Sequence, residues 1–405
     1  MSVAAGSVDQ KAGGPGTYAA HMRIVHVLQR VNFHDGGPPR AVVDLCGVQH
    51  GRGHQVTLLT TDTTDVPQAW ATGGPDVCQV PKPSLPTGLF APGQLRGARD
   101  VLAGADVVHC HAVWERMNAQ VASMCRALGT PYVITLRGML DDWCMAQGPT
   151  KKRLYLRVMG RRYLEGAAFV HCTAQGEADQ SHQWFPKGTP RVIPNLIDLA
   201  DYQTLPDPAE ARAQWPLLEG DGPVLLFLSR IHEKKGIEHL VDALPALIEQ
   251  HPNLQVMLAG TGDDAYVAAL KQRADRVGVA DRMHWLGHVG GSLKLSLYAA
   301  ADVFVLPSSQ ENFGFVQFEA MACGTPCMTT TMVDTHHEVV ASGGGIAVTQ
   351  SADGIVDGLA PVLADAQVRT AMGQTGRAWV LEHLATDRVA GLIEAMYQDA
   401  ADGRG

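Results

Sequence analysis

One stretch in the last third of the chain decides its fold, and it reads Glu311-Asn312-Phe313-Gly314-Phe315-Val316-Gln317-Phe318-Glu319. An apolar run at 303–307 precedes it and is typical of a buried strand, and its second half has the pattern of a helix. A buried strand, a tight turn and a helix form the repeating unit of parallel sheets. The stretch therefore predicts an α/β unit with Glu311 in the turn and Glu319 about one turn into the helix.

Units of the same kind recur along the chain. The predicted strands lie at 24–28, 55–60, 107–109, 132–135, 169–172 and 192–194 in the first half, and at 224–229, 254–259, 283–286, 303–307, 325–329 and 345–348 in the second. Continuous apolar strands separated by helices predict parallel sheets covered on both faces. Because the two halves echo each other, the predicted fold class is α/β, with two Rossmann-like doubly wound domains facing a central cleft.

The composition of the first residues and the position of a Pro-rich segment set the expected domain limits. The 405 residues suffice for two domains of ordinary size. Residues 1–21 are rich in Gly, Ala and Ser and predict a flexible leader, with Met22 as an alternative natural start. We expect domains at 22–203 and 204–378, joined by a Pro-rich linker at 205–208. Helical patterns follow at 367–377 and 379–398, and the last is expected to cross back onto the first domain.

The overall composition excludes several classes of protein. A net charge of −9 argues against a general nucleic-acid binder. The chain has neither an apolar run of about 20 residues nor a secretory signal pattern. Its eight cysteines contain no C-x-x-C pair, which favours buried thiols in a reducing compartment. We therefore expect a cytoplasmic protein. A metal site formed by His109, Cys110 and His111 is not expected, because the two histidines share a strand face and Cys110 points to the other face.

A second charged cluster precedes the opening stretch by about 80 residues. Arg230 and Lys235 follow the strand at 224–229 and precede a helical run at 237–250. A helix N-terminus favours anions, and a guanidinium with an ammonium suits a diphosphate. A solvated charged turn is the alternative. For Glu319, which suits the vicinal hydroxyls of a ribose, the alternative is an ordinary helix carboxylate. Together the two clusters predict a pocket for a nucleotide-activated sugar.

With these motifs identified, the chain resembles family-4 retaining glycosyltransferases of the glycosyltransferase-B fold. The likeness rests on two glutamates separated by seven residues within 308–326, and on the pair formed by Arg230 and Lys235. The segment Pro194-Asn195-Leu196-Ile197-Asp198 is similar to the family's usual Pro-Asn-Gly-Val-Asp, with Leu196 replacing Gly. A glycine loop at 32–40 completes the likeness, which covers about 22–348.

The resemblance implies a role for each matching residue. Catalytic roles fall to Arg230, Lys235 and Glu311, of which the two cations would neutralise the leaving diphosphate. Donor-binding roles fall to Gly36, Gly37, Asn312, Phe313, Gly314, Phe315 and Glu319. The glycine pair would let the backbone approach the diphosphate, because any side chain there would block the approach.

Three further residues of the first half are candidate acceptor or sugar contacts. His111 and Trp114 end a strand where the cleft is expected, although a buried histidine and a core tryptophan are the alternatives. Arg137 stands where many relatives carry His, within a run Arg-Gly-Met-Leu that one branch of the family shares. An Arg stays protonated and cannot act as a base, so a phosphate or acceptor contact is expected. A structural pairing with Asp141 or Asp142 is the alternative.

The segment 151–163 carries six cations among apolar residues. Such a helix suits an anionic membrane surface or a lipid-diphosphate acceptor, and an ordinary helix with solvated cations is the alternative. Peripheral contact with the inner face of a membrane is therefore one expectation. The sequence does not indicate an oligomeric state.

These observations predict a retaining glycosyltransferase. It would move a hexose-type sugar from a UDP- or GDP-sugar to a glycan or lipid-linked acceptor, in surface polysaccharide or glycoconjugate synthesis, without metal or cofactor. The alternatives are a nucleotide-sugar epimerase or a phosphorylase on the same fold, or a non-catalytic nucleotide-sugar-binding subunit. No nucleic-acid partner is expected.

Overall fold

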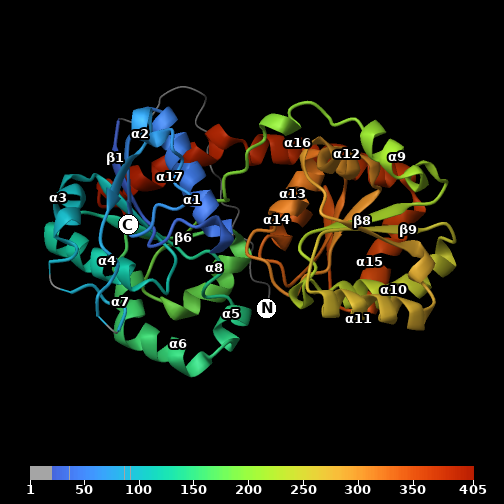
Figure 1. Cartoon of the computed structure of the whole chain (residues 1–405), viewed down its shortest axis with the longest axis horizontal. Helices are drawn as coiled ribbons and strands as arrows, with labels where there is room; N and C mark the ends of the chain where they lie inside the picture. The colour runs from blue at the N-terminus through green and yellow to red at the C-terminus, as the bar shows by residue number, and fades with distance from the viewer. Residues whose placement is uncertain (1–20, 36, 86, 92) are drawn as a thin grey trace, which may run out of the picture.

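Two separate parallel sheets organise residues 21–35, 37–85, 87–91 and 93–405, which are the residues that this computed structural model describes (Figure 1). The first sheet has seven strands in the order β3-β2-β1-β4-β5-β6-β7, and the second has six in the order β10-β9-β8-β11-β12-β13. Every neighbouring pair of strands is parallel. In each sheet the first strand along the chain lies near the middle, and later strands are added on both sides of it. The predicted class of two doubly wound α/β domains is confirmed.

The strand bounds follow the predicted apolar runs closely. The first sheet comprises β1 (Arg23–Val27), β2 (Gln55–Thr60), β3 (Asp76–Gln79), β4 (Val107–His111), β5 (Tyr132–Thr135), β6 (Phe169–Cys172) and β7 (Pro190–Val192). The second comprises β8 (Val224–Leu228), β9 (Gln255–Ala259), β10 (Met283–Gly287), β11 (Val303–Leu306), β12 (Cys327–Thr330) and β13 (Gly345–Val348). The sequence missed β3, because this edge strand is largely exposed and has no continuous apolar run.

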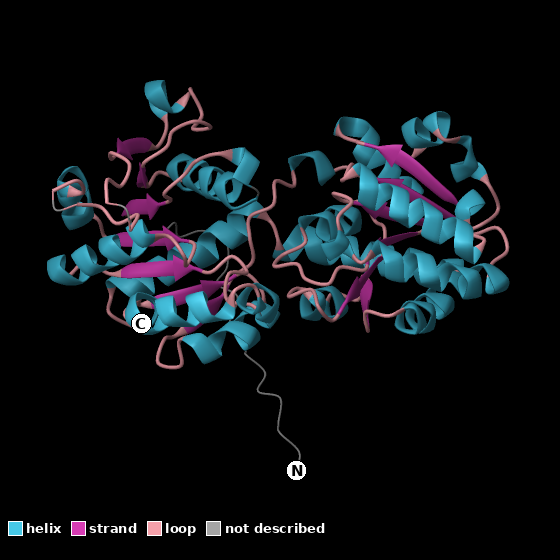
Figure 2. Ribbon diagram, turned by 60° about the horizontal axis from the view of Figure 1, so that its bottom comes forward, coloured by secondary structure: helices cyan, strands magenta, loops and turns pink. Residues whose placement is uncertain are grey.

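Helices cover both faces of each sheet (Figure 2). In the first domain these are α1 (Gly37–Gly51), α2 (Trp70–Gly73), α3 (Arg96–Gly104), α4 (Arg116–Leu128), α5 (Asp142–Ala146), α6 (Pro149–Tyr155), α7 (Arg161–Leu164) and α8 (Gln175–Ser181). In the second they are α9 (Ala209–Gln214), α10 (Ile237–Gln250), α11 (Asp264–Val277), α12 (Gly291–Ala300), α13 (Phe315–Ala322), α14 (His336–Ala341), α15 (Ala352–Ala364) and α16 (Ala366–His383). The last helix is α17 (Thr386–Ala401).

The two faces of the first sheet belong to different cores. Val25, Val108 and Ile134 pack on one face with helices such as α4, whereas Ile24 and Val107 pack on the other. This division follows from the two-residue period of a strand. Because both faces are buried, the strands read as continuous apolar runs, which is why the sequence predicted most of them.

The chain crosses between the domains twice. At the first crossing Ile197, Leu199 and Tyr202 already pack in the core of the second domain. At the second, α16 ends at His383 and α17 packs against the first sheet (Figure 1). The expected break at 378 was wrong, because α16 continues through that position as one helix. Of the expected leader, only His21 lies within the described residues.

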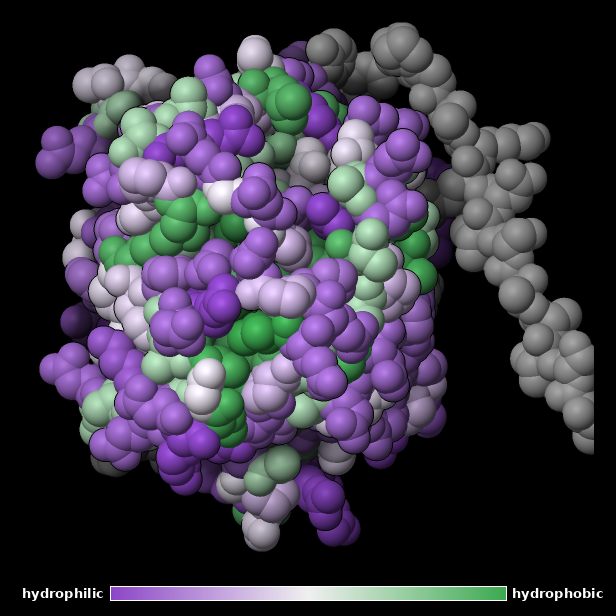
Figure 3. Space-filling model, turned by 90° about the vertical axis from the view of Figure 1, so that its right-hand side faces the viewer, coloured by the Kyte–Doolittle hydropathy of each residue, from purple (hydrophilic) through white to green (hydrophobic). Residues whose placement is uncertain are grey.

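All eight cysteines are free thiols, and six of them are buried. Cys110 lies in the core of one sheet face, away from the face that carries His109 and His111, as strand alternation predicted. The face of the second domain turned away from the first is largely hydrophilic, with only scattered apolar areas (Figure 3).

Candidate active site

The predicted site lies at the carboxyl ends of the strands, where the loops that follow the strands of one sheet contact those of the other. In the second domain, a short 3-10 turn (Glu233–Lys235) joins β8 to α10, and a loop through Glu311 joins β11 to α13. Gly236 and Gly314 begin the two helices in the left-handed region, with φ of 62° and 65°. Both positions therefore favour glycine, as sharp strand-to-helix turns require.

Lys235 and Glu311 are brought together by these two loops. The Lys235 Nζ forms an ion pair with the Glu311 Oε1, and the two side chains are only 10% and 20% exposed. The loops are also joined through their backbones, since the Ser309 amide donates to the Lys234 carbonyl at 2.8 Å. The carboxylate holds the largely buried ammonium in a fixed position, where it could also donate to an anionic ligand.

Glu319 lies apart from that pair and has its own partners. Its Oε2 accepts from the Lys294 Nζ at 3.0 Å and from the Tyr298 hydroxyl at 3.1 Å, both on α12. Burial and the charge of Glu319 raise the pKa of Tyr298 well above its usual value, so this phenol remains a donor. Lys294 and Tyr298 were not among the site residues predicted from the sequence. Their signal was a lysine and a tyrosine four residues apart, and so on one face of a mostly apolar helix.

Arg230 is exposed and, within the described parts of the chain, has no hydrogen-bond or ion-pair partner. It stands directly after β8, on the same connection as Lys235. The structure thus pairs one predicted cation with one predicted carboxylate and leaves the other cation available to a ligand.

The loop that starts α13 uses its side chains structurally. Phe313 is buried and packs against Phe315 and Phe318, with ring centroids 4.9 and 5.0 Å apart. Asn312 spans the two domains, because its Oδ1 accepts from the Thr173 hydroxyl at 3.1 Å and its Nδ2 donates to Asp334 at 3.2 Å. A ligand at this loop would therefore meet backbone groups and glycine rather than these side chains.

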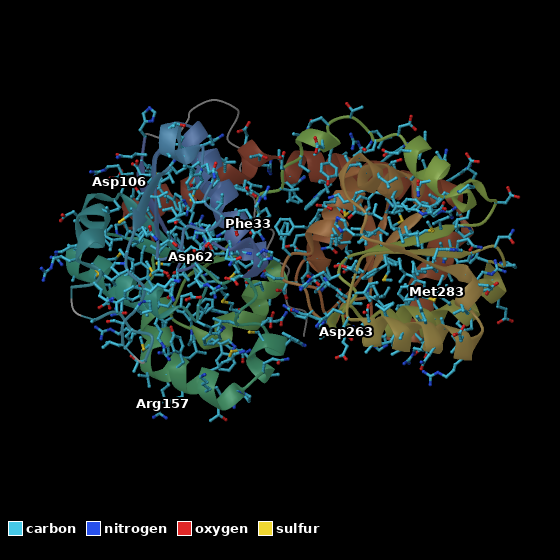
Figure 4. The ribbon with its side chains drawn as sticks, in the orientation of Figure 1. Phe33, Asp62, Asp106, Arg157, Asp263 and Met283 are labelled. Carbon is cyan, nitrogen blue, oxygen red and sulfur yellow. The ribbon has the colours of Figure 1, made fainter. Side chains whose placement is uncertain are left out.

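The glycine loop of the first domain is only partly described. Gly36 lies outside the described residues, and Gly37 begins α1, where a Cβ would meet nothing within 4 Å. Phe33, near the start of this loop, lies on the side of the first domain that faces the second (Figure 4). The predicted need for glycine at position 37 therefore depends on a ligand and not on the protein's own packing.

The three candidate acceptor contacts differ in accessibility. His111 is fully buried. Trp114 packs edge-on against Tyr155 with centroids 5.5 Å apart, and the Lys152 Nζ lies 5.6 Å from its ring centroid. Arg137 donates to the Asn195 Oδ1 at 3.0 Å and makes a longer contact of 3.4 Å with the His111 Nδ1.

The alternative prediction for Arg137, a structural pairing with Asp141 or Asp142, is wrong. Neither Asp141 nor Asp142 forms an ion pair with it in the described chain. Asp141 instead accepts from the Cys144 amide and from the Gln310 side chain.

Direct contacts join the domains around this site. Gln180 donates to Asp334 at 2.8 Å, the Gly176 amide donates to the Asp334 carbonyl at 3.2 Å, and the Lys234 Nζ lies 4.3 Å from the ring centroid of Trp143. These contacts link the carboxyl-end loops of one sheet to those of the other, in the place where ligands of doubly wound folds bind.

Burial shifts the protonation of three acids at this contact. Desolvation raises the pKa of Asp141 to about 6 and that of Asp334 to about 8, and it also raises the pKa of Glu177. Nearby carboxylates reinforce the first two shifts. Perturbed acids of this kind gather at functional sites.

Other features of the described chain do not coincide with the predicted site. Hollows of about 460, 570 and 540 Å³ are lined by residues that include none of the predicted site residues. His26, His109 and His111 bring ring nitrogens within 4.8 Å of one another, as metal ligands would, but the charge of Arg137 beside them disfavours a cation.

Comparison with known proteins gives consistent matches over both domains. The model of glycosyl transferases group 1 matches residues 210–379, and that of the glycosyl transferase 4-like domain matches residues 36–196. A phosphatidyl-myo-inositol mannosyltransferase of Mycolicibacterium smegmatis is 30% identical over 351 residues, which cover 82% of this chain and 83% of the relative. A D-inositol 3-phosphate glycosyltransferase of Actinosynnema mirum is 31% identical over 323 residues, covering 73% and 76%.

Solved structures share the fold. The Anabaena protein HepE in complex with UDP has a TM-score of 0.75 at 20% identity, covering 93% of this chain and all of that one. The same protein with UDP-glucose gives a TM-score of 0.69 at 20% identity and covers 93% of this chain and 100% of that one. At this identity the likeness shows the architecture alone.

Proposed function

Because the chain belongs to the group 1 glycosyltransferases, we propose that it transfers a hexose-type sugar from a UDP- or GDP-sugar to a glycan or lipid-linked acceptor with retained anomeric configuration. The observation that carries this proposal is the Lys235–Glu311 pair between the two sheets, with Arg230 on the same connection and without a partner among the described residues. A diphosphate offers an anionic partner to Arg230 and further anionic oxygens to Lys235, whose one acidic partner in the described chain is Glu311.

In the proposed mechanism, Lys235 and Arg230 stabilise the diphosphate as it leaves, which is where negative charge grows in the transition state. The bond between the anomeric carbon and the diphosphate oxygen breaks. The acceptor hydroxyl attacks from the same face, and its proton passes to the departing phosphate oxygen. This route needs no separate base, which agrees with the absence of an unpaired, exposed carboxylate among the predicted site residues that the structure describes.

Glu319 would hold the two hydroxyls of the ribose in this arrangement. Lys294 and Tyr298 already fix the position of its carboxylate, so one oxygen is oriented before a ligand arrives. Preorientation of this kind reduces the entropy cost of binding. Glu311 would orient the transferred sugar together with the backbone of 312–315.

The substitution Lys235→Ala tests the proposal. We expect turnover to fall about 10²–10³-fold, the usual loss when one charge-stabilising donor is removed. The measurement is release of UDP or GDP from a panel of nucleotide sugars, and Lys187→Ala, a change of an exposed lysine, serves as the matched control. Wild-type turnover in the Lys235→Ala protein would remove this residue from the site.

The same assay separates the competing activities. An epimerase would convert its nucleotide sugar without any acceptor, a phosphorylase would need free phosphate, and a binding subunit would release no nucleotide. Slow donor hydrolysis that an added glycan or lipid-linked acceptor accelerates supports the transferase.

The exposed side chains of the segment 151–163 support peripheral contact with an anionic membrane as part of this function. Leu154 and Val158 are 61% and 68% exposed one turn apart, and cations surround them. Arg157, between the two, lies at the outer edge of the first domain (Figure 4). Exposed apolar side chains among cations suit the interface of an anionic bilayer. No helix in the described part of the chain combines the length and apolar character that crossing a membrane requires.

Co-sedimentation with vesicles tests this contact. The wild-type protein is expected to bind vesicles that contain phosphatidylglycerol and to bind purely zwitterionic ones less, while Leu154→Asp weakens binding to both. The exposed residue Val340, changed to Asp, is the control on the second domain. Equal sedimentation of wild-type protein with and without anionic lipid contradicts the proposal.

A further inference from the structure

We propose that Arg137 forms a second anion site, distinct from Arg230 and Lys235, which receives a phosphate or carboxylate group carried by the acceptor or by the transferred sugar. The inference rests on the proposed function for the identity of those substrates. Its basis is a guanidinium that forms no ion pair with the described residues and whose hydrogen-bond partners among them are neutral.

Arg137 has only neutral partners in the described chain. Its two terminal nitrogens contact the Asn195 Oδ1 and the His111 Nδ1, and its Nε is buried without a hydrogen-bond partner. The opposite charge that acts on it most strongly is Glu177. That carboxylate already accepts from the amides of Gly138 and Thr173. Arg137 as a whole is half-buried. Since a cation partly removed from water without an ion-pair partner is costly, an anion that enters here gains a strong partner.

A layer of histidines behind Arg137 explains why its partners stay neutral. Burial lowers the pKa of His26 to about 4, and it lowers the pKa of His111 well below the usual value. The hydrogen bonds then fix the tautomers. His111 accepts from Arg137, so its Nε2 donates to the His26 Nδ1 at 3.0 Å, and the His26 Nε2 donates to the Gln49 Oε1 at 2.7 Å.

A second series of hydrogen bonds, beside the one through His111 and His26, also consists of neutral groups. The Tyr397 hydroxyl donates to the His109 Nδ1 and His109 donates to the Thr135 hydroxyl, both at 2.5 Å. Thr135 donates to His171 at 2.8 Å, and His171 donates to the Ile193 carbonyl at 2.7 Å. Each of these groups already has its partner, so this layer holds Arg137 in place without cancelling its charge.

The backbone conformation at Arg137 places this residue next to the contact between the two domains. Arg137 has a φ of 56°, a left-handed conformation that is uncommon for residues other than glycine. Strain of this kind persists where the surrounding structure enforces it, often at functional sites. The next residue, Gly138, lies so close to the second domain that a Cβ there would stand 2.9 Å from the Asn312 Cβ. An anion at Arg137 would therefore lie beside the loop proposed to hold the transferred sugar.

The experiment first saturates the intact protein with UDP or GDP and then titrates inorganic phosphate, following the melting temperature. The wild-type protein is expected to gain further stability from phosphate because the nucleotide leaves Arg137 free. Arg137→Gln is expected to lose this second gain and to keep the gain from nucleotide. Arg153→Gln, a change of an exposed arginine, is the matched control.

Two results overturn the inference. One is a phosphate effect in Arg137→Gln equal to that in the wild-type protein, and the other is no phosphate effect in the nucleotide-bound wild-type protein. If Arg137→Gln does not fold, Arg137→Lys retains the charge without the forked donor and is expected to bind phosphate more weakly than wild type. Failure of UDP and GDP to bind, with a phosphate effect that still depends on Arg137, rejects the proposed function and leaves the anion site standing.

Kinetics then separate the two sources of the anion. Loss of a hydrogen bond to a charged group corresponds to about 10-fold or more in affinity. If the acceptor carries the group, Arg137→Gln raises the KM for a phosphorylated acceptor by at least this factor and leaves the KM of an unphosphorylated acceptor unchanged. If the sugar carries it, the KM for UDP-glucuronate rises in the same way relative to UDP-glucose.

Discussion

Asp334 illustrates how single residues at the domain contact depend on their burial. Its carboxyl group has two amide donors, Asn312 and Gln180, yet desolvation and the nearby carboxylates Glu177 and Asp141 raise its pKa to about 8. The unfolded chain would titrate this group near the ordinary value of 3.8. Between these two values the folded protein holds a proton that the unfolded chain has released.

This difference makes stability depend on pH. The contribution of Asp334 is greatest at acidic pH and is lost as pH rises toward and through about 8, at about 1.4 kcal/mol per unit. Asp334→Asn lacks this titration, so its melting temperature relative to wild type should rise between pH 5 and pH 9 by several degrees. The buried histidines are common to both proteins and cancel in the difference. Asp221→Asn, an exposed position, is the control, and a pH-independent difference contradicts the assignment.

At the scale of elements, α17 shows how a terminal helix becomes part of a distant domain. Val389, Ile393, Met396 and Tyr397 are buried against β1, β4, β5 and β6. Arg52 of the first domain anchors the helix through Glu394, with hydrogen bonds of 2.7 and 3.0 Å. The first domain therefore depends on residues almost 400 positions from the start of the chain.

The packing of α17 can be tested with two methionines. Met396 is fully buried, whereas Met332 is 49% exposed. Met396→Ala is expected to lower the free energy of unfolding by about 2–5 kcal/mol, because it removes apolar contacts and leaves a cavity. Met332→Ala should change it by less than about 0.5 kcal/mol. Chemical denaturation measures both, and a similar effect of the two changes would mean that α17 contributes little.

For the molecule as a whole, one close backbone approach limits how far apart the domains can lie while their other contacts are kept. Gly176, in the first turn of α8, lies against the backbone of Asp334, and a Cβ on Gly176 would stand 2.5 Å from the Asp334 carbonyl oxygen. No real Cβ tolerates that distance, and backbone atoms on both sides have little freedom to yield. Only glycine allows the first domain to approach the loop after β12 this closely.

Gly176→Ala should therefore move the domains apart and lower turnover while both cores remain folded. Small-angle scattering should show a larger radius of gyration, and circular dichroism should show unchanged helix content. Gly391→Ala is the control, since a Cβ there meets nothing within 4 Å. As a replacement within a helix it should stabilise the protein by about 0.5–1 kcal/mol. Unchanged scattering and turnover in Gly176→Ala would show that this contact does not set the domain arrangement.

The sequence by itself determined the fold class, nearly every strand and the two strand-to-helix turns that carry Lys235 and Glu311, because strands buried on both faces and turns that require glycine leave local patterns. The ion pair between these two side chains was shown only by the tertiary structure. It did not reveal the edge strand β3, whose exposed side chains carry no such pattern. Only the tertiary structure showed Lys294 and Tyr298 beside Glu319, and the neutral histidine layer behind Arg137. Those contacts join residues far apart in the chain, and burial, which sets their protonation, arises only when the sheets and α17 come together.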